Sequence, residues 1–140
     1  MMLLLDTHVF LWWREASPRV GEADRRANAQ AEFVYVSAVS AWEVAIKVGI
    51  GKLRIPGPIG PAVAHSQFEQ LPITFAHASV VTGLPAHHGD PFDRMLIAQA
   101  LVEELTLVTH DRRFEPYGVP VNLGMRGALR RAACISMSIS

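Results

Sequence analysis

The sequence predicts an α/β fold with three layers, in which a central parallel sheet is flanked by helices. Short apolar runs alternate along the chain with longer stretches whose apolar residues recur at helical spacing. The apolar runs are continuous rather than interrupted by polar residues, which is typical of parallel strands covered on both faces. Strands that alternate with helices favour a parallel sheet with helices on both sides.

The composition indicates one folded domain. The chain has 140 residues, 50% of them hydrophobic and 19% charged, so it can bury a sizeable core and is too apolar for general disorder. No apolar run approaches the roughly 20 residues of a membrane span, and the N-terminus has no basic region typical of a secretory signal. The lone cysteine, Cys134, excludes a disulfide framework. We therefore expect a cytoplasmic protein without a membrane partner.

The N-terminal elements follow from local patterns. The apolar run Met2–Leu5 predicts the first strand, which Asp6 closes. Thr7–Glu15 is expected to be a helix rich in aromatic residues. Ser17-Pro18 places a capping serine before a proline at the first helical position, and so predicts a second helix that runs through Val20–Ala31.

A second strand and a further helix follow. The run Phe33–Val36 is aromatic and β-branched, which favours a strand. The helix expected over Ser37–Val48 is capped either by Ser37 or by Ser40, because Ser40 and Glu43 have the spacing of a capping box.

The rest of the chain continues the alternation of helices and strands. A short strand that contains Pro72 is expected at the edge of the sheet, since proline cannot donate a ladder hydrogen bond. The expected helices are Ala62–Gln70, Ala76–Gly83 and Pro91–Glu104, and the expected strands are Leu71–Thr74, Leu105–Thr109 and Val119–Val121.

Four acidic residues from separate parts of the chain are expected to meet at one edge of the sheet. Asp6 and Asp111 each follow an apolar strand, and open α/β sheets bind ligands beyond the carboxyl ends of their strands. Glu43 and Asp93 lie early in predicted helices, where helix N-termini favour carboxylates. Oxygen ligands suit Mg²⁺ or Mn²⁺ rather than zinc, and such an ion can activate water for phosphodiester hydrolysis. The pattern therefore predicts a metal-dependent enzyme.

Each of these acids also has an ordinary structural explanation. Asp6 could cap a helix, Asp93 could complement a helix dipole, and Glu43 could close a capping box. The convergence of four acids at one edge favours the metal site over separate caps. Asp90, three residues before Asp93, is either a fifth acid of that site or the N-cap of the following helix, and the cap is favoured.

Four segments of the chain resemble the PIN domain and, more narrowly, the VapC toxins of bacterial toxin–antitoxin pairs. They are Leu3–His8, Ser37–Glu43, Asp90–Ala100 and Leu107–Asp111, which stand in the order that the family has. The resemblance covers residues 2–123. We therefore expect residues 1–123 to form the PIN domain, and residues 124–140 to form a C-terminal appendage that is helical at best.

The resemblance implies a Mg²⁺- or Mn²⁺-dependent endoribonuclease, usually homodimeric, that a VapB-type antitoxin holds inactive. The family's acidic quartet falls on Asp6, Glu43, Asp93 and Asp111, which are therefore the expected catalytic and metal-binding residues. Two hydroxyl residues beside the quartet, Thr7 and Thr109, are candidates for additional members of the site, and so is Asp90 if it is not only the N-cap.

Three arginines beside the acids are candidate contacts to RNA phosphates: Arg94, Arg112 and Arg113. Arginine binds phosphate bidentately, although a solvated basic face is an equally open reading of these residues. The thirteen basic and thirteen acidic residues cancel, so net charge predicts no indiscriminate binding to polyanions.

Other readings of the sequence are less favoured. His87-His88 suggests zinc, but adjacent histidines on a loop point apart and no third histidine stands at helical spacing. The three tryptophans, Trp12, Trp13 and Trp42, are expected in the core more than at a base-stacking surface.

Two functional alternatives remain. One is another metal-dependent phosphohydrolase or nuclease that acts on DNA or small phosphates. The other is a non-catalytic PIN-like binding module, which has no reason to keep four mutually repelling carboxylates.

Overall fold

The computed structural model describes residues 2–15, 26, 29–118, 121–122 and 131–132, which form a six-stranded sheet covered by helices. The strand order is β3-β2-β1-β4-β5-β6, and all neighbours are parallel except β5 and β6. The strands are β1 (Met2–Leu5), β2 (Phe33–Ser37), β3 (Glu69–Leu71), β4 (Thr106–Val108), β5 (Val121–Asn122) and β6 (Arg131–Ala132).

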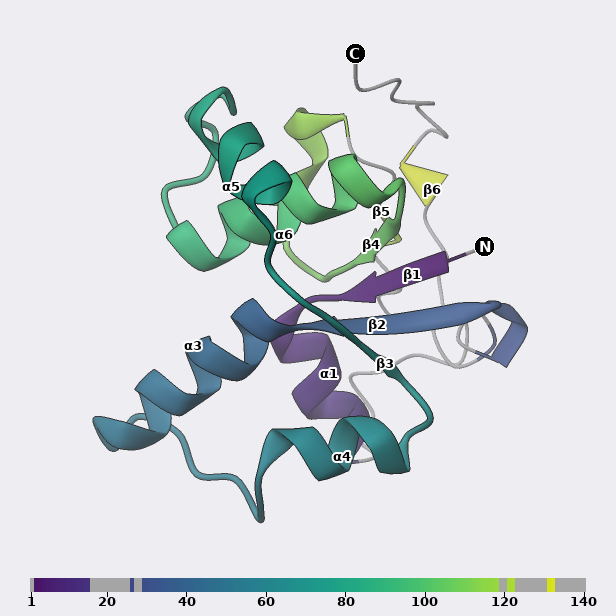
Figure 1. The fold of residues 1–140 in the computed structure, drawn as a ribbon, viewed down its shortest axis with the longest axis vertical. Coiled ribbons are helices and arrows are strands. Elements are labelled where there is room, and N and C mark those ends of the chain that lie inside the picture. Colours follow the sequence, from purple (N-terminus) through teal and green to yellow (C-terminus); the bar gives the residue numbers. More distant parts are fainter. Residues whose placement is uncertain (1, 16–25, 27–28, 119–120, 123–130, 133–140) are drawn as a thin grey trace.

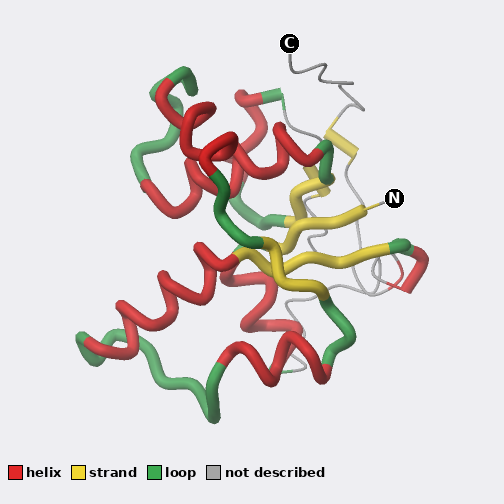
Figure 2. The backbone as a smooth tube through the Cα atoms, viewed as in Figure 1, coloured by secondary structure: helices red, strands yellow, loops and turns green. Residues whose placement is uncertain are grey.

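Helices lie on both sides of this sheet, with α1 and α4 on one side and α5 and α6 on the other (Figure 1). Figure 2 shows the strands as a yellow layer between the two groups of helices. None of the helices among the described residues has the length and apolar character to cross a membrane. The helices are α1 (Thr7–Arg14), α3 (Ala38–Gly49), α4 (Ile59–His65), α5 (Phe75–Thr82), α6 (Pro91–Glu103) and the 3₁₀ helix η1 (Arg112–Tyr117).

The side chains of β1 divide between two cores. Leu4 packs with residues of α6, β4 and η1, whereas Leu3 and Leu5 pack with residues of α1, β2 and α4. All three leucines are fully buried, which explains why the run is apolar at every position. The prediction of a three-layer α/β fold with a central parallel sheet is therefore confirmed.

Where capping and periodicity agree, most of the predicted helix and strand boundaries are confirmed to within about one residue. The first strand ends before Asp6, and α6 begins at Pro91 with Asp90 as its N-cap. Asp90 Oδ1 accepts hydrogen bonds from the backbone N–H groups of Phe92 at 2.8 Å and Asp93 at 3.2 Å. The prediction that Asp90 caps this helix is therefore confirmed.

Of the two predicted caps for this helix, the capping box that begins at Ser40 is wrong. Ser37 caps α3, because its hydroxyl accepts a hydrogen bond from Val39 N at 3.0 Å while its own backbone is still extended. The strand β2 runs one residue further than predicted, to Ser37, and pairing with β3 holds that residue in the extended conformation that an N-cap requires. Ser40 consequently lies inside the helix and is buried.

The boundaries predicted between residues 59 and 74 are also wrong. The helix α4 begins at Ile59, because Pro61 lies in its first turn, where no N–H partner is needed. The chain then turns at Gln67, whose φ is 59°, and β3 ends before Pro72. The strand precedes that proline because each of its residues pairs with β2, and proline could not donate to the ladder.

The C-terminal part departs from expectation where the chain returns to the sheet. Arg131 and Ala132 pair antiparallel with Asn122 and Val121, so these two residues of the predicted helical appendage form a strand instead. The other residues of 124–140, and residues 119–120 of the predicted last strand, lie outside the described residues. The same holds for the predicted helix through Val20–Ala31, of which only residues 26, 29 and 30 are described as helical.

Candidate metal centre

Asp6 lies where β1 ends and α1 begins, and both of its carboxylate oxygens accept hydrogen bonds. Oδ1 accepts from the N–H of Val9 at 2.8 Å, which makes Asp6 the N-cap of α1. Oδ2 accepts from Thr109 Oγ1 at 2.5 Å, a contact made possible because β1 and β4 are parallel neighbours that end at the same edge. Burial raises the pKa of Asp6 despite these hydrogen bonds. A cap alone does not require a buried carboxylate with a second, cross-strand donor.

Glu43 projects into the site from the second turn of α3 and is 3% exposed. Oε1 lies 2.8 Å from Thr7 Oγ1, and Oε2 accepts a hydrogen bond from Lys47 Nζ at 2.7 Å. Thr7 Oγ1 is also 2.8 Å from Ser40 Oγ, and we give its single hydrogen to the carboxylate, which can only accept. Glu43 is not in a capping box, because Ser37 caps this helix, so the structural explanation for its position is wrong.

Asp93 occupies the first turn of α6, close to the other acids. Burial raises the pKa of this carboxyl to about 8, and the charges of Asp90, Asp6, Glu43 and Asp111 add to the effect in that order. The charges of the other three acids of the predicted quartet therefore act on Asp93.

Asp111 caps η1 and is held by Arg113. Its Oδ1 accepts from the backbone N–H of Arg113 at 2.9 Å, and its Oδ2 lies 2.7 Å from Arg113 Nη2. Burial raises the pKa of Asp111, but the hydrogen bonds and positive charge of Arg113 outweigh it, so the pKa is below its ordinary value. Asp111 therefore stays ionised more easily than Asp6 or Asp93.

His88 is the residue of the site that the sequence reasoning set aside. Its Nε2 lies 2.8 Å from Asp93 Oδ2 and 3.4 Å from Asp111 Oδ2, and the residue is 3% exposed. Among the described residues, His88, Asp93 and Asp111 form a group whose candidate ligand atoms all lie within 4.8 Å of one another. The two histidines do point apart, since the His87 ring lies against Tyr117. The position of His88, only two residues before Asp90 in the loop that leads into the site, could have indicated from the sequence that it belongs to the site.

The three arginines are placed differently. Arg94 donates hydrogen bonds to main-chain carbonyls, among them those of Val81, Leu84 and Pro85, and so it holds the loop between α5 and α6. Arg112 is exposed and pairs with Glu115 at 3.2 Å. Arg113 is at the site, on Asp111. Arg112 and Arg113 therefore remain predicted phosphate contacts, whereas Arg94 stabilises the loop between α5 and α6.

The tryptophans also divide. Trp12 and Trp13 are partly buried against the core on the α1 side of the sheet, whereas Trp42 is 59% exposed. Trp42 adjoins Glu43 in sequence, and its ring meets that of Phe92 edge-on at 5.2 Å. The expectation that the tryptophans lie in the core is therefore wrong for Trp42.

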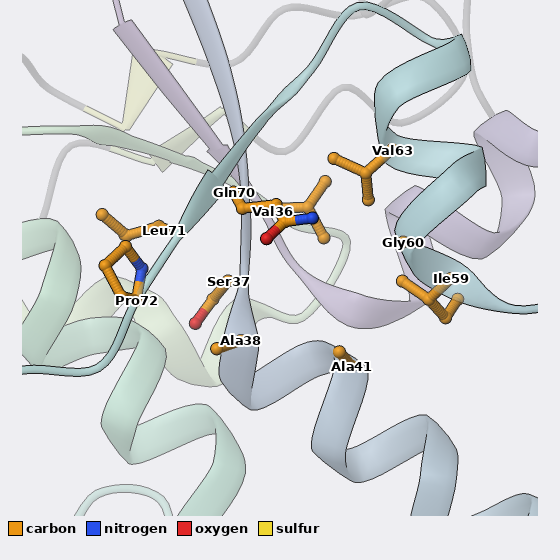
Figure 3. Close-up of a pocket in the computed structure, with 10 residues that line it drawn as sticks. All are labelled: Val36, Ser37, Ala38, Ala41, Ile59, Gly60, Val63, Gln70, Leu71 and Pro72. Atoms are coloured by element: carbon orange, nitrogen blue, oxygen red, sulfur yellow. The ribbon is translucent and has the colours of Figure 1, made fainter.

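The donor set fits a divalent cation with oxygen ligands. Asp93 and Asp111 lie with His88 in one group of candidate ligand atoms, and the charges of Asp6 and Glu43 act on Asp93. The pKa values of Asp6 and Asp93 are raised, as expected of carboxyls in a buried, negative environment. A cavity of about 330 Å³ lies elsewhere, between the ends of β2 and β3 and helices α3 and α4 (Figure 3). Its lining includes Ile59, Val63 and Leu71 and has no acidic or basic residue, so it is not a metal site.

Thr109→Val is expected to destabilise the protein by about 1–3 kcal/mol, because Asp6 Oδ2 and the N–H of Asp111 would both lose their partner. The measurement is the free energy of unfolding in urea without added metal. Thr106→Val, on the same strand, is the matched control and should have little effect. Equal stabilities of the two variants would contradict a structural role for the Thr109 hydroxyl.

An acidic cluster at the carboxyl edge of a parallel sheet places this chain in the class of α/β proteins whose site suits a divalent metal. The family model of the PIN domain matches residues 3–119, and the chain belongs to this family. It is 30% identical over 121 residues to Ribonuclease VapC22 of Mycobacterium tuberculosis, a match that covers 84% of this chain and 93% of the relative.

Solved structures of similar fold include two VapBC structures bound to DNA. VapBC2 from Rickettsia felis, bound to a DNA fragment from its promoter, matches with a TM-score of 0.64 and 16% identity, covering 84% of this chain and 93% of the other. DNA-bound VapBC from Salmonella typhimurium matches with a TM-score of 0.61 and 22% identity, covering 85% and 94%. At these identities the likeness concerns the fold.

Proposed function

We propose that the chain is a VapC-type endoribonuclease that hydrolyses RNA phosphodiester bonds with the help of Mg²⁺ or Mn²⁺. The observation that supports the proposal is the group of Asp93, Asp111 and His88, whose candidate ligand atoms lie within 4.8 Å of one another, with Asp6 and Glu43 acting electrostatically on Asp93. The 30% identity to a named ribonuclease over most of both chains supports RNA as the substrate.

In this proposal, Asp6, Glu43, Asp93 and Asp111 hold the ion, directly or through water. The bound ion supplies charge that stabilises a phosphate oxygen and acidifies water. Thr109 and Thr7 hold Asp6 and Glu43 in place through the hydrogen bonds described above. One of the four carboxylates is the proposed acceptor of the proton from the attacking water.

The exposed arginines Arg112 and Arg113 are the proposed contacts to RNA phosphates. Both follow Asp111 directly, and the Arg113 guanidinium already lies against a site carboxylate. A guanidinium can grip a phosphate through two parallel hydrogen bonds. The proposed partners are the RNA substrate, a VapB-type antitoxin and a second copy of the chain. The antitoxin is supported by the solved complexes of similar fold.

The test is to incubate the purified protein with tRNA, mRNA and single-stranded DNA in the presence of Mg²⁺ or Mn²⁺. We expect cleavage of RNA that EDTA abolishes and that excess Mn²⁺ restores. Cleavage of DNA with RNA left intact would favour the alternative of a DNA nuclease. RNA cleavage that persists in EDTA would contradict the proposal. Addition of the VapB-type antitoxin should suppress the cleavage.

A further inference from the structure

Resting on the proposed function, we infer that His88 is a positioning residue that holds the carboxylates of Asp93 and Asp111 together through its Nε2–H, and that it is not itself a metal ligand. The two acids come from different segments, one from the first turn of α6 and the other from the N-cap of η1. His88 Nε2 lies 2.8 Å from the carboxylate of Asp93 and 3.4 Å from that of Asp111.

The tautomer of His88 decides between ligand and donor. The backbone N–H of Asp90 donates a hydrogen bond to His88 Nδ1 at 3.2 Å. A main-chain amide can only donate, so Nδ1 must carry a lone pair, and the hydrogen of the neutral ring is on Nε2. Metal-ligating histidines show the reverse arrangement, in which the nitrogen away from the metal donates. His88 therefore presents an N–H to the carboxylates, although its distances alone would suit a ligand.

The contacts of Nε2 are close in distance but not aligned. Neither carboxylate oxygen lies in line with the N–H bond, so this buried nitrogen has no hydrogen-bond partner by geometry in spite of the 2.8 Å separation. Two neighbouring carboxylates repel each other, and the polar N–H that lies beside both offsets this repulsion without a linear hydrogen bond to either. The N–H thus acts on both carboxylates through its proximity.

The surroundings fix the ring in this place. The backbone N–H of His88 donates to Tyr117 Oη at 2.8 Å, and Tyr117 Oη donates to the carbonyl of Pro85 at 2.9 Å. The imidazole also meets the buried ring of Phe114 edge-on, with centroids 5.5 Å apart. The side chain of His88 is 1% exposed. A ring held at its main chain, at Nδ1 and on its face can set the separation of the two carboxylates.

Two substitutions separate the ring's functions. His88→Gln places an amide N–H near the position of Nε2 and keeps the donor to the carboxylates. His88→Asn places an amide oxygen near the position of Nδ1, which keeps the acceptor for Asp90 N–H but loses that donor. If His88 mattered only for packing, both substitutions would disturb the protein, and His88→Asn would not lower the metal affinity more than His88→Gln.

The experiment measures Mn²⁺ binding through the loss of the free-ion EPR signal, with thermal unfolding of each variant in parallel. We expect His88→Asn to weaken Mn²⁺ binding by about 10–100-fold, the range for residues that orient metal ligands, and His88→Gln to remain close to wild type. Pulsed EPR of the wild-type Mn²⁺ complex should show no directly bound nitrogen.

Three results would overturn the inference. Equal Mn²⁺ affinity in wild type and His88→Asn would exclude a positioning role. Equal losses in both variants would indicate packing alone. Strong nitrogen hyperfine coupling that disappears in both variants would make His88 a ligand. These outcomes leave the proposed nuclease function standing, whereas a wild-type protein that binds no Mn²⁺ at all would overturn the function and this inference together.

Discussion

Asp6→Asn is expected to lower the rate of RNA cleavage by about 10²–10³-fold, the equivalent of the several kcal/mol that a correctly held metal ion contributes. The substitution removes one negative charge and changes almost no volume. Asparagine retains an oxygen for the N–H of Val9, so the cap of α1 is kept. The amide N–H₂ replaces Oδ2, which accepts from Thr109, so some stability is expected to be lost as well, and the comparison of thermal unfolding separates this loss from the loss of chemistry. Single-turnover cleavage, with the protein in saturating excess over RNA, is the measurement.

The control for this prediction is Glu69→Gln, which makes the same chemical change at an exposed position on β3, away from the site. It should cleave RNA at the wild-type rate. Both variants are compared with wild type in thermal unfolding, which shows that the proteins are folded. Wild-type activity in Asp6→Asn would mean that a contaminating nuclease, rather than this site, produces the cleavage, and the assignment of the acidic quartet would fail.

Metal affinity is expected to rise by about tenfold per pH unit between about pH 6 and pH 8, and then to level off. The reason is the Asp93 carboxyl, whose pKa burial and the neighbouring acids raise to about 8. Below that pH the group holds a proton, which a cation must displace before the carboxylate can serve as a ligand. A titration with Mn²⁺ at a series of pH values, followed by EPR, measures the slope.

The same shift predicts how the protein without metal responds to pH. The folded-state pKa of Asp93 is raised above its unfolded value of 3.8, so folding binds a proton. The stabilisation from this group is therefore fully present below about pH 4 and is lost as the pH rises through about 8. Burial raises the pKa of Asp6 as well, which acts in the same direction. Added Mn²⁺ should restore stability at the alkaline end.

Asp93→Asn is the matched variant for the pH prediction, because it fixes the group in a neutral form. Its stability without metal should fall less steeply with pH than that of wild type, and its Mn²⁺ affinity should be weak at every pH. An affinity in wild type that is the same at about pH 6 and pH 8 would show that Asp93 does not lose a proton when metal binds.

The sequence alone determined the elements whose signals are local. The apolar run before Asp6 defines β1, and the Asp90-Pro91 pair defines the start of α6, because capping and strand burial depend on a few neighbouring residues. The same local signals placed Asp6 and Asp111 at strand ends, where parallel strands bring them to one edge of the sheet.

Tertiary structure decided what depends on contacts between distant segments. Ser37 rather than Ser40 caps α3 because pairing between β2 and β3 extends the strand, and Thr109 meets Asp6 across 103 positions of sequence. His88 approaches Asp111 only because η1 and the loop before α6 pack together through Tyr117. Periodicity and capping carry no information on such pairings, since they are set by packing and by hydrogen bonds between elements. The sequence thus predicted which acids form the proposed site, and the tertiary structure decided which donors hydrogen-bond to them.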